Sequence, residues 1–171
     1  MEIRTERLLL RPPGADDLEA MFVIMSDPAA MRYWSTLPHA DRGVTRIWLD
    51  RMIARNKAGG EDFVIEQQGR IVGTVGAGRP PEFGFVLHPE SWGRGLATEA
   101  SVACIDHIFR TTRVAELTAD VDPRNAASLR VLDKLGFAEI GRASQTFRLG
   151  DQWCDSIYLA LPRPVRRAAT W

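Results

Sequence analysis

Two glycines lie in a loop between an apolar segment and an amphipathic segment, a position where a protein can bind phosphate groups. Residues 82–88 have the composition of a strand, and residues 95–109 carry apolar side chains at the spacing of a helix. Gly93 and Gly95 lie in the loop between them. Free N–H groups at a helix start attract anions, and glycine has no side chain to keep the backbone from a pyrophosphate. The spacing predicts a phosphate-binding loop.

A second segment, residues 122–137, carries two polar side chains at helical spacing. Asn125 and Ser128 are three residues apart and so share one face of the expected helix. Asparagine is a common N-cap, but its amide can also bind a ligand. Serine in a first helical turn can bond the local backbone or serve as a proton donor. The sequence leaves both alternatives open for each residue.

The cysteines and histidines have no spacing that suggests a metal site. Cys104 and Cys154 are the two cysteines, too few for a disulfide framework or a zinc-ligand set. The three histidines, His39, His88 and His107, are scattered. We therefore expect reduced thiols, Cys104 in the core, and no metal.

The charge balance and hydropathy restrict the class of protein. The 171 residues contain 22 Lys+Arg and 22 Asp+Glu, a net charge of zero, which argues against a general nucleic-acid binder. The first residues lack the apolar run of a signal peptide, and no stretch approaches the length of a membrane span. We expect a soluble, cytoplasmic protein; a homodimer is compatible with the sequence.

The elements that must position these residues follow from periodicity and turn signals. Strands are expected at 8–10, 62–67, 70–77, 82–88, 114–121, 137–149 and 152–161, and helices at 16–25, 42–57, 95–109 and 125–135. The tight turns between successive strands favour hairpins. The pattern predicts a single domain over residues 1–161, followed by a flexible tail over 162–171.

Four segments in order resemble one family. They are Thr5–Pro12, Trp92-Gly93-Arg94-Gly95-Leu96-Ala97, Asp122–Phe137 and Trp153–Tyr158. Together they resemble the GNAT acyltransferase superfamily, and most closely its ribosomal-protein N-terminal acetyltransferase branch. The superfamily loop reads Gln/Arg-x-x-Gly-x-Gly/Ala. Trp92 replaces the first polar residue here, a form common in that branch.

The resemblance implies an α+β fold with three layers, in which helices flank a mixed, mostly antiparallel sheet. Its central strands, 82–88 and 114–121, would be parallel neighbours that splay apart and hold the pantetheine arm of acetyl-coenzyme A (acetyl-CoA), the co-substrate. The implied cofactor-binding residues are Val86 and Leu87 through their backbone, Trp92, Gly93, Arg94, Gly95, Leu96, Ala97 and Thr98 around the pyrophosphate, and Asn125 beside the pantetheine.

Acetyl transfer to an amine needs a base for the amine and a proton donor for the departing thiolate. The family often uses a tyrosine as donor, but neither Tyr33 nor Tyr158 lies on the expected helix 125–135. Ser128, which lies on that helix, is therefore the expected donor. Glu82, at the start of the cofactor strand, is the expected base, acting directly or through water. Trp34 is expected either to line the acceptor pocket or to pack a loop.

Two rival functions remain open at this stage. A dinucleotide-dependent oxidoreductase also places Gly-x-Gly between a strand and a helix, but here Thr98 replaces its third glycine and a second βαβαβ half is missing. A non-catalytic acyl-CoA sensor would share the cofactor loop. Arg32, Arg42 and Arg46 make the expected acceptor region mildly basic, which favours a peptide N-terminus or an amino-acid-like amine as acceptor.

Overall fold

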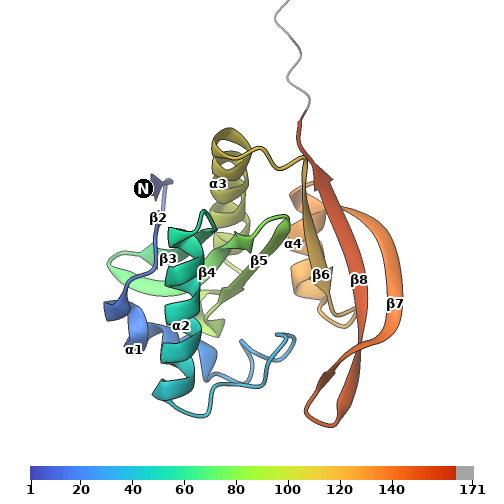
Figure 1. The fold of residues 1–171 in the computed structure, drawn as a ribbon, viewed down its shortest axis with the longest axis horizontal. Coiled ribbons are helices and arrows are strands. Elements are labelled where there is room, and N and C mark those ends of the chain that lie inside the picture. Colours follow the sequence, from blue (N-terminus) through green and yellow to red (C-terminus); the bar gives the residue numbers. More distant parts are fainter. Residues whose placement is uncertain (165–171) are drawn as a thin grey trace, which may run out of the picture.

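The computed structural model describes residues 1–164 and contains one sheet of eight strands, ordered β1-β2-β3-β4-β5-β6-β8-β7 (Figure 1). The strands are β1 (Ile3–Arg4), β2 (Leu9–Arg11), β3 (Glu61–Gln67), β4 (Arg70–Arg79), β5 (Glu82–Leu87), β6 (Glu116–Val121), β7 (Ala138–Leu149) and β8 (Gln152–Pro162). The helices are α1 (Leu18–Met25), α2 (Arg42–Lys57), α3 (Leu96–Thr111) and α4 (Ala126–Lys134), with 3-10 turns η1 (Ala15–Asp17) and η2 (Pro89–Ser91).

One strand pair differs from all the others in this sheet. Strands β5 and β6 are parallel, whereas every other neighbouring pair is antiparallel. They pair only at Glu82 and Thr118, where the Thr118 N–H donates to the Pro81 carbonyl at 2.8 Å. Beyond that point they diverge, so the backbone groups that face the gap are left for another partner. The splayed central pair is confirmed.

Helices cover both faces of the sheet because alternate strand residues point to opposite sides. The larger core cluster joins α3 and Leu132 of α4 to one face, through Phe63, Ile65 and Leu87 among others. The smaller cluster joins α1 and α2 to the other face, through Val64 and Val86. The expected three-layer α+β architecture is therefore confirmed.

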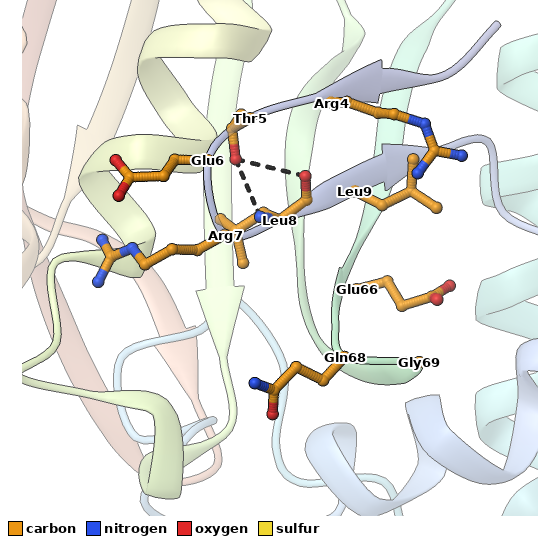
Figure 2. A pocket seen from close by; sticks show the side chains of 9 residues that line it. All are labelled: Arg4, Thr5, Glu6, Arg7, Leu8, Leu9, Glu66, Gln68 and Gly69. Atoms are coloured by element: carbon orange, nitrogen blue, oxygen red, sulfur yellow. Dashed lines mark hydrogen bonds between the residues drawn. The ribbon is translucent and has the colours of Figure 1, made fainter.

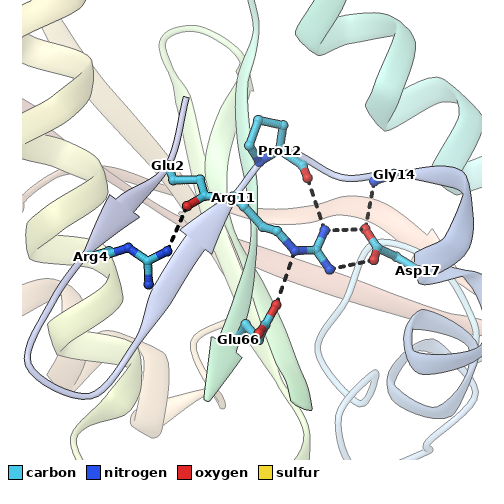
Figure 3. Close-up of polar contacts among 7 residues, drawn as sticks. All are labelled: Glu2, Arg4, Arg11, Pro12, Gly14, Asp17 and Glu66. Carbon is cyan, nitrogen blue, oxygen red and sulfur yellow. Dashed lines mark hydrogen bonds and ion pairs between the residues drawn. The ribbon is translucent and has the colours of Figure 1, made fainter. Parts of the chain in front are cut away.

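An ion-pair cluster ties the first helical turn to the edge of the sheet (Figure 3). Arg11 of β2 donates to both carboxylate oxygens of Asp17, at 2.7 and 3.0 Å, and to Glu66 of β3 at 3.2 Å. Asp17 also accepts from the Gly14 N–H at 2.7 Å. The hydrogen bond from Arg11 to Asp17 raises the pKa of Arg11, so the guanidinium keeps its charge here.

The structure extends the last strand beyond its expected end. Strand β8 runs through Pro162, and the Arg163 guanidinium donates to the carbonyls of Val114 and Thr112 at 2.8 and 2.9 Å. The expected loose tail therefore does not include Pro162 or Arg163, and residues 165–171 lie outside the described residues. Strand β1 was not expected, since two residues are too short to show a period. Over residues 1–164, none of the helices has the length and apolar character needed to cross a membrane.

Candidate active site

The glycine loop leads directly into α3, and its geometry suits an anion. Gly93 and Gly95 have φ angles of 71° and 76°, a left-handed conformation that side chains rarely adopt. Gly95 is the N-cap of α3 and supplies no capping side chain, so the first N–H groups of the helix are not capped by one. A side chain at Gly93 would meet open space rather than protein. These features fit a pyrophosphate bound by backbone N–H groups at a helix N-terminus.

The backbone of β5 presents alternate residues to the gap between β5 and β6. The His88 N–H donates to the Val72 carbonyl of the β4 side, and the Pro81 carbonyl accepts from β6. Because N–H and C=O groups alternate in direction along a strand, Val86 faces β4, whereas Phe85 and Leu87 face the gap. The backbone groups of Val86 are therefore directed to β4, and its expected contact with pantetheine stays a prediction; the expected contact of Leu87 is consistent with this arrangement.

Trp92 links the glycine loop to the cofactor strand. Its indole Nε1–H donates to the Leu87 carbonyl at 2.8 Å, although half of the side chain remains exposed. An indole provides a donor and a broad apolar face. This contact gives a structural reason for the tryptophan at the first position of the motif.

A cavity of about 680 Å³ runs along the splay from the glycine loop to the segment between α1 and α2. Its lining includes every expected cofactor and acceptor residue except Arg94: Trp34, Val86, Leu87, Trp92, Gly93, Gly95, Leu96, Ala97, Thr98 and Asn125, with the expected donor Ser128. It also includes Arg130 and Lys134 of α4, whose charges suit phosphate groups. The residues present therefore fit an extended, phosphorylated thioester.

Asn125 and Ser128 line this cavity at the start of α4. Asn125 is the N-cap of α4, and its Oδ1 accepts from the Ser128 N–H at 3.1 Å. Capping occupies the carbonyl oxygen of the amide and leaves its NH₂ group available. Capping and ligand contact by Asn125 are thus compatible, and Ser128 is held at the cavity through its own backbone.

Sequence reasoning missed a cationic and aromatic cluster on the acceptor side. Two guanidinium groups lie over the Tyr33 ring, with the Cζ atoms of Arg32 and Arg124 at 5.3 and 6.0 Å from its centroid. Arg32 and Tyr33 line the cavity. The adjacent tyrosine and tryptophan at positions 33 and 34 were the available signal. The approach of Arg124 from the β6–α4 turn had no signal in the sequence.

A buried carboxylate holds Arg124 in this cluster. Asp122 accepts from the Arg124 Nε–H at 2.9 Å and from the Arg124 backbone N–H at 2.8 Å. The hydrogen bond from the Arg124 side chain lowers the pKa of Asp122, despite the opposing effect of burial. The pair carries no net charge, so the cluster keeps the positive charge of Arg32. Arg32 has no ion-pair partner among residues 1–164.

Two expected site residues lie outside the cavity lining. Glu82 is exposed at the first residue of β5, where that strand still pairs with β6, and it does not line the cavity. The Arg94 side chain is exposed, and the backbone carbonyl of Arg94 accepts a hydrogen bond from the Arg7 guanidinium.

The two cysteines and His107 are buried in the protein interior. Cys104 is fully buried in the larger core, as expected, and burial raises the pKa of its thiol. Cys154 is buried, and its sulfur lies 3.6 Å from Nη2 of Arg124. His107 is also buried and bonds Glu61 at 3.1 Å. Among residues 1–164, His, Cys, Asp and Glu form no group of three that could hold a metal ion.

The chain matches a family model, described as an acetyltransferase (GNAT) domain, over residues 7–138. A spermidine N(1)-acetyltransferase of Escherichia coli (strain K12) is 27% identical over 158 residues, covering 89% of this chain and 84% of the relative. The [ribosomal protein uS5]-alanine N-acetyltransferase of the same organism is 32% identical over 81 residues, 47% of this chain and 42% of the relative.

Solved structures agree with this match. An acetyltransferase of the GNAT family from Bacillus anthracis superimposes with a TM-score of 0.81 at 26% identity, covering 95% of this chain and 99% of that one. A ribosomal L7/L12 alpha-N-protein acetyltransferase in complex with coenzyme A has the same fold, with a TM-score of 0.84 at 20% identity, covering 95% and 98%. The chain therefore belongs to the GNAT acetyltransferase family and is an N-acetyltransferase that uses acetyl-CoA.

Proposed function

We propose that the acceptor is a peptide N-terminus or an amino-acid-like amine with a carbonyl or carboxylate close to the amine. The observation that carries this proposal is the cluster of Arg32, Tyr33 and Arg124 on the acceptor side of the cavity. A guanidinium without an anionic partner attracts a carboxylate and orients a carbonyl, and it repels a polycation.

The transfer proceeds directly between the two substrates. The neutral amine attacks the thioester carbonyl carbon, so a C–N bond forms, the C–S bond breaks and the electron pair leaves with sulfur. The new amide nitrogen gives up one proton to water, and the thiolate receives one from the Ser128 hydroxyl, which is replenished from solvent. Backbone N–H groups that face the splay stabilise the developing oxyanion, since fixed dipoles need no reorganisation. No acyl-enzyme intermediate on a cysteine is required.

The groups that could serve the leaving thiolate are few. Ser128 lines the cavity from α4, and Tyr33 lines it from the segment between α1 and α2. Ser128 is supported by its position on the helix next to Asn125, whereas the Tyr33 ring is in contact with the guanidinium groups of Arg32 and Arg124. Ser128 is therefore the proposed donor, and Tyr33 is proposed to shape the acceptor pocket with Trp34.

A polyamine is the second candidate acceptor, because one relative is a spermidine N(1)-acetyltransferase. Polyamine binding favours a concentration of carboxylates. Among the described residues that line this cavity, none is an aspartate or glutamate, and three are cations, Arg32, Arg130 and Lys134. The charge of the lining therefore favours the first candidate.

An acceptor panel tests the proposal. The purified chain would be assayed by thiol release with acetyl-CoA and N-terminal peptides, free amino acids, spermidine and an aminoglycoside at physiological salt. We expect the highest kcat/KM for an α-amine next to a carbonyl. Arg32→Ala should lower that value and Arg46→Ala, which removes a cation outside the cavity lining, should not.

Two outcomes would contradict the proposal in different ways. A higher kcat/KM for spermidine than for any peptide or amino acid would replace the acceptor class and leave acetyl transfer intact. Tight binding of acetyl-CoA without turnover of any amine would favour the acyl-CoA sensor.

A further inference from the structure

The β1–β2 turn, which carries no assigned role, reaches the glycine loop through Arg7. The Arg7 Nη1–H donates to the Arg94 carbonyl at 2.9 Å, between the two glycines of the loop. Its Nη2 atom lies 3.6 Å from the position that a Cβ at Gly95 would take. Figure 2 shows the Arg7 side chain extending from this turn, away from Arg4 and Leu9. The N-terminal segment is thus in direct contact with the candidate pyrophosphate site.

Glu99, in the first turn of α3, fixes Arg7 from the other side. Its carboxylate accepts from the Arg7 Nε–H at 2.6 Å, the Arg7 backbone N–H at 2.9 Å and the Thr5 hydroxyl at 2.6 Å. Burial acts to raise the pKa of Glu99, but the hydrogen bonds from Thr5 and Arg7 outweigh it and lower that pKa. The Arg7 guanidinium therefore donates to both Glu99 and the Arg94 carbonyl, and these two acceptors fix its orientation.

Because a peptide unit is planar, the contact of Arg7 with the Arg94 carbonyl also determines the orientation of the next N–H in the loop. The Arg94 carbonyl and the Gly95 N–H belong to one planar trans peptide, so they point in opposite directions. Because Arg7 fixes the carbonyl, it also fixes the direction of the Gly95 N–H. Gly95 alone would tolerate other orientations, since glycine populates both signs of φ. A cation on the carbonyl also polarises the peptide and strengthens its N–H as a donor.

We propose that Arg7 is a positioning residue for acetyl-CoA, and that it acts by orienting the Arg94–Gly95 peptide toward the pyrophosphate. Arg7 acts through this peptide and does not itself touch the cofactor. Glu99 and Thr5 support it by fixing the guanidinium. The inference rests on acetyl-CoA binding at the glycine loop and is independent of which amine accepts the acetyl group.

The test compares a ligand with and without the pyrophosphate. Dissociation constants for CoA, by calorimetry, and for pantetheine, by NMR titration, would be measured for the wild type, Arg7→Ala and Arg7→Lys. We expect Arg7→Ala to weaken CoA about 10- to 100-fold, the range for one misdirected hydrogen bond to a charged group, and to leave pantetheine unchanged. Arg7→Lys keeps one donor for the Arg94 carbonyl and should recover part of the affinity.

Arg4→Ala is the matched control, since Arg4 lies in the same segment and, among residues 1–164, pairs only with the exposed Glu2. It should change neither dissociation constant. Unchanged CoA affinity in Arg7→Ala would overturn the proposal, and so would an equal loss for CoA and pantetheine, which would indicate a general distortion of the cavity. Because both ligands are measured without an acceptor, the result also stands apart from the acceptor proposal.

Discussion

The two ends of the cavity are built in different ways. The expected cofactor end is built mainly of backbone groups in one continuous stretch, from Leu87 through the glycine loop to the first turn of α3, with side chains of Asn125, Arg130 and Lys134 in the same cavity. The acceptor end consists of side chains from separate segments: Tyr33 comes from the α1–α2 connection, and Arg124 from the β6–α4 turn. Figure 1 shows that α1–α2 connection extending toward β6 and β8.

This difference explains why one end could be read in the sequence and the other could not. A backbone site needs only the φ angles and spacing of a few neighbouring residues, which glycines at fixed positions reveal. A side-chain site depends on which loops meet in space. The cofactor end therefore identifies the family, whereas the substrate preference is proposed to depend on the acceptor end.

A charge placed at the cofactor end should have the largest effect. Gly95→Glu puts a carboxylate beside the pyrophosphate and imposes a left-handed φ on a side chain, so we expect CoA binding to weaken by about 100-fold or more. CoA-dependent thermal stabilisation would measure it. Gly59→Glu is the matched control, because Gly59 has a φ of 95° and open surroundings at the end of α2. Equal loss of CoA stabilisation in both variants would assign the effect to strain.

Removal of the proposed proton donor should have the next largest effect. We expect Ser128→Ala to lower kcat about 10²- to 10⁴-fold, the usual contribution of an acid–base group, with little change in CoA affinity. Tyr33→Phe and Glu82→Gln are the comparisons. Tyr33→Phe should keep most of kcat, and Glu82→Gln should leave the pH–rate profile unchanged, because Glu82 lies outside the cavity. A normal kcat in Ser128→Ala with a low one in Tyr33→Phe would exchange the two roles.

Loss of the buried carboxylate should separate the two ends of the cavity. Asp122→Asn removes the charge that fixes Arg124, so we expect a higher KM for the acceptor, an unchanged KM for acetyl-CoA and about 1–3 kcal/mol less stability at pH 7. The folded state lowers the pKa of Asp122, so its stabilisation is present above the unfolded value near 3.9 and is lost as the pH falls through the folded value. Urea unfolding should therefore show the variant approaching the wild type below about pH 4. A constant difference down to pH 2 would contradict the ion pair.

The cysteines should have the smallest effect on activity. Direct transfer forms no acyl-enzyme, so the double variant Cys104→Ser, Cys154→Ser should keep the wild-type kcat, although a hydroxyl at the buried position 104 costs some stability. Mass spectrometry of the protein during turnover would check the mechanism. An acetylated cysteine that forms and decays at the rate of turnover would contradict it.

Much of the fold followed from local patterns. The elements expected from periodicity, including α3 with its apolar spacing of four and the β7–β8 hairpin, are all present. Three features were not expected from these patterns. Strand β1 is too short to show a period, and Arg163 is held by backbone carbonyls on a distant turn. Strand alternation also directs the backbone groups of Val86 to β4 and those of Phe85 to the gap, because the direction of a backbone group depends on register with β4.

The sequence by itself determined the family and the three-layer fold and predicted the cofactor end, because the four segments that carry the resemblance are each short and continuous. Only the tertiary structure decided that Glu82 lies outside the cavity, that Tyr33 meets Arg124, and that Arg7 reaches the Arg94 carbonyl 87 residues along the chain. The physical reason is that side-chain contacts between distant segments depend on how the sheet and its loops pack. No periodicity within one segment records that packing.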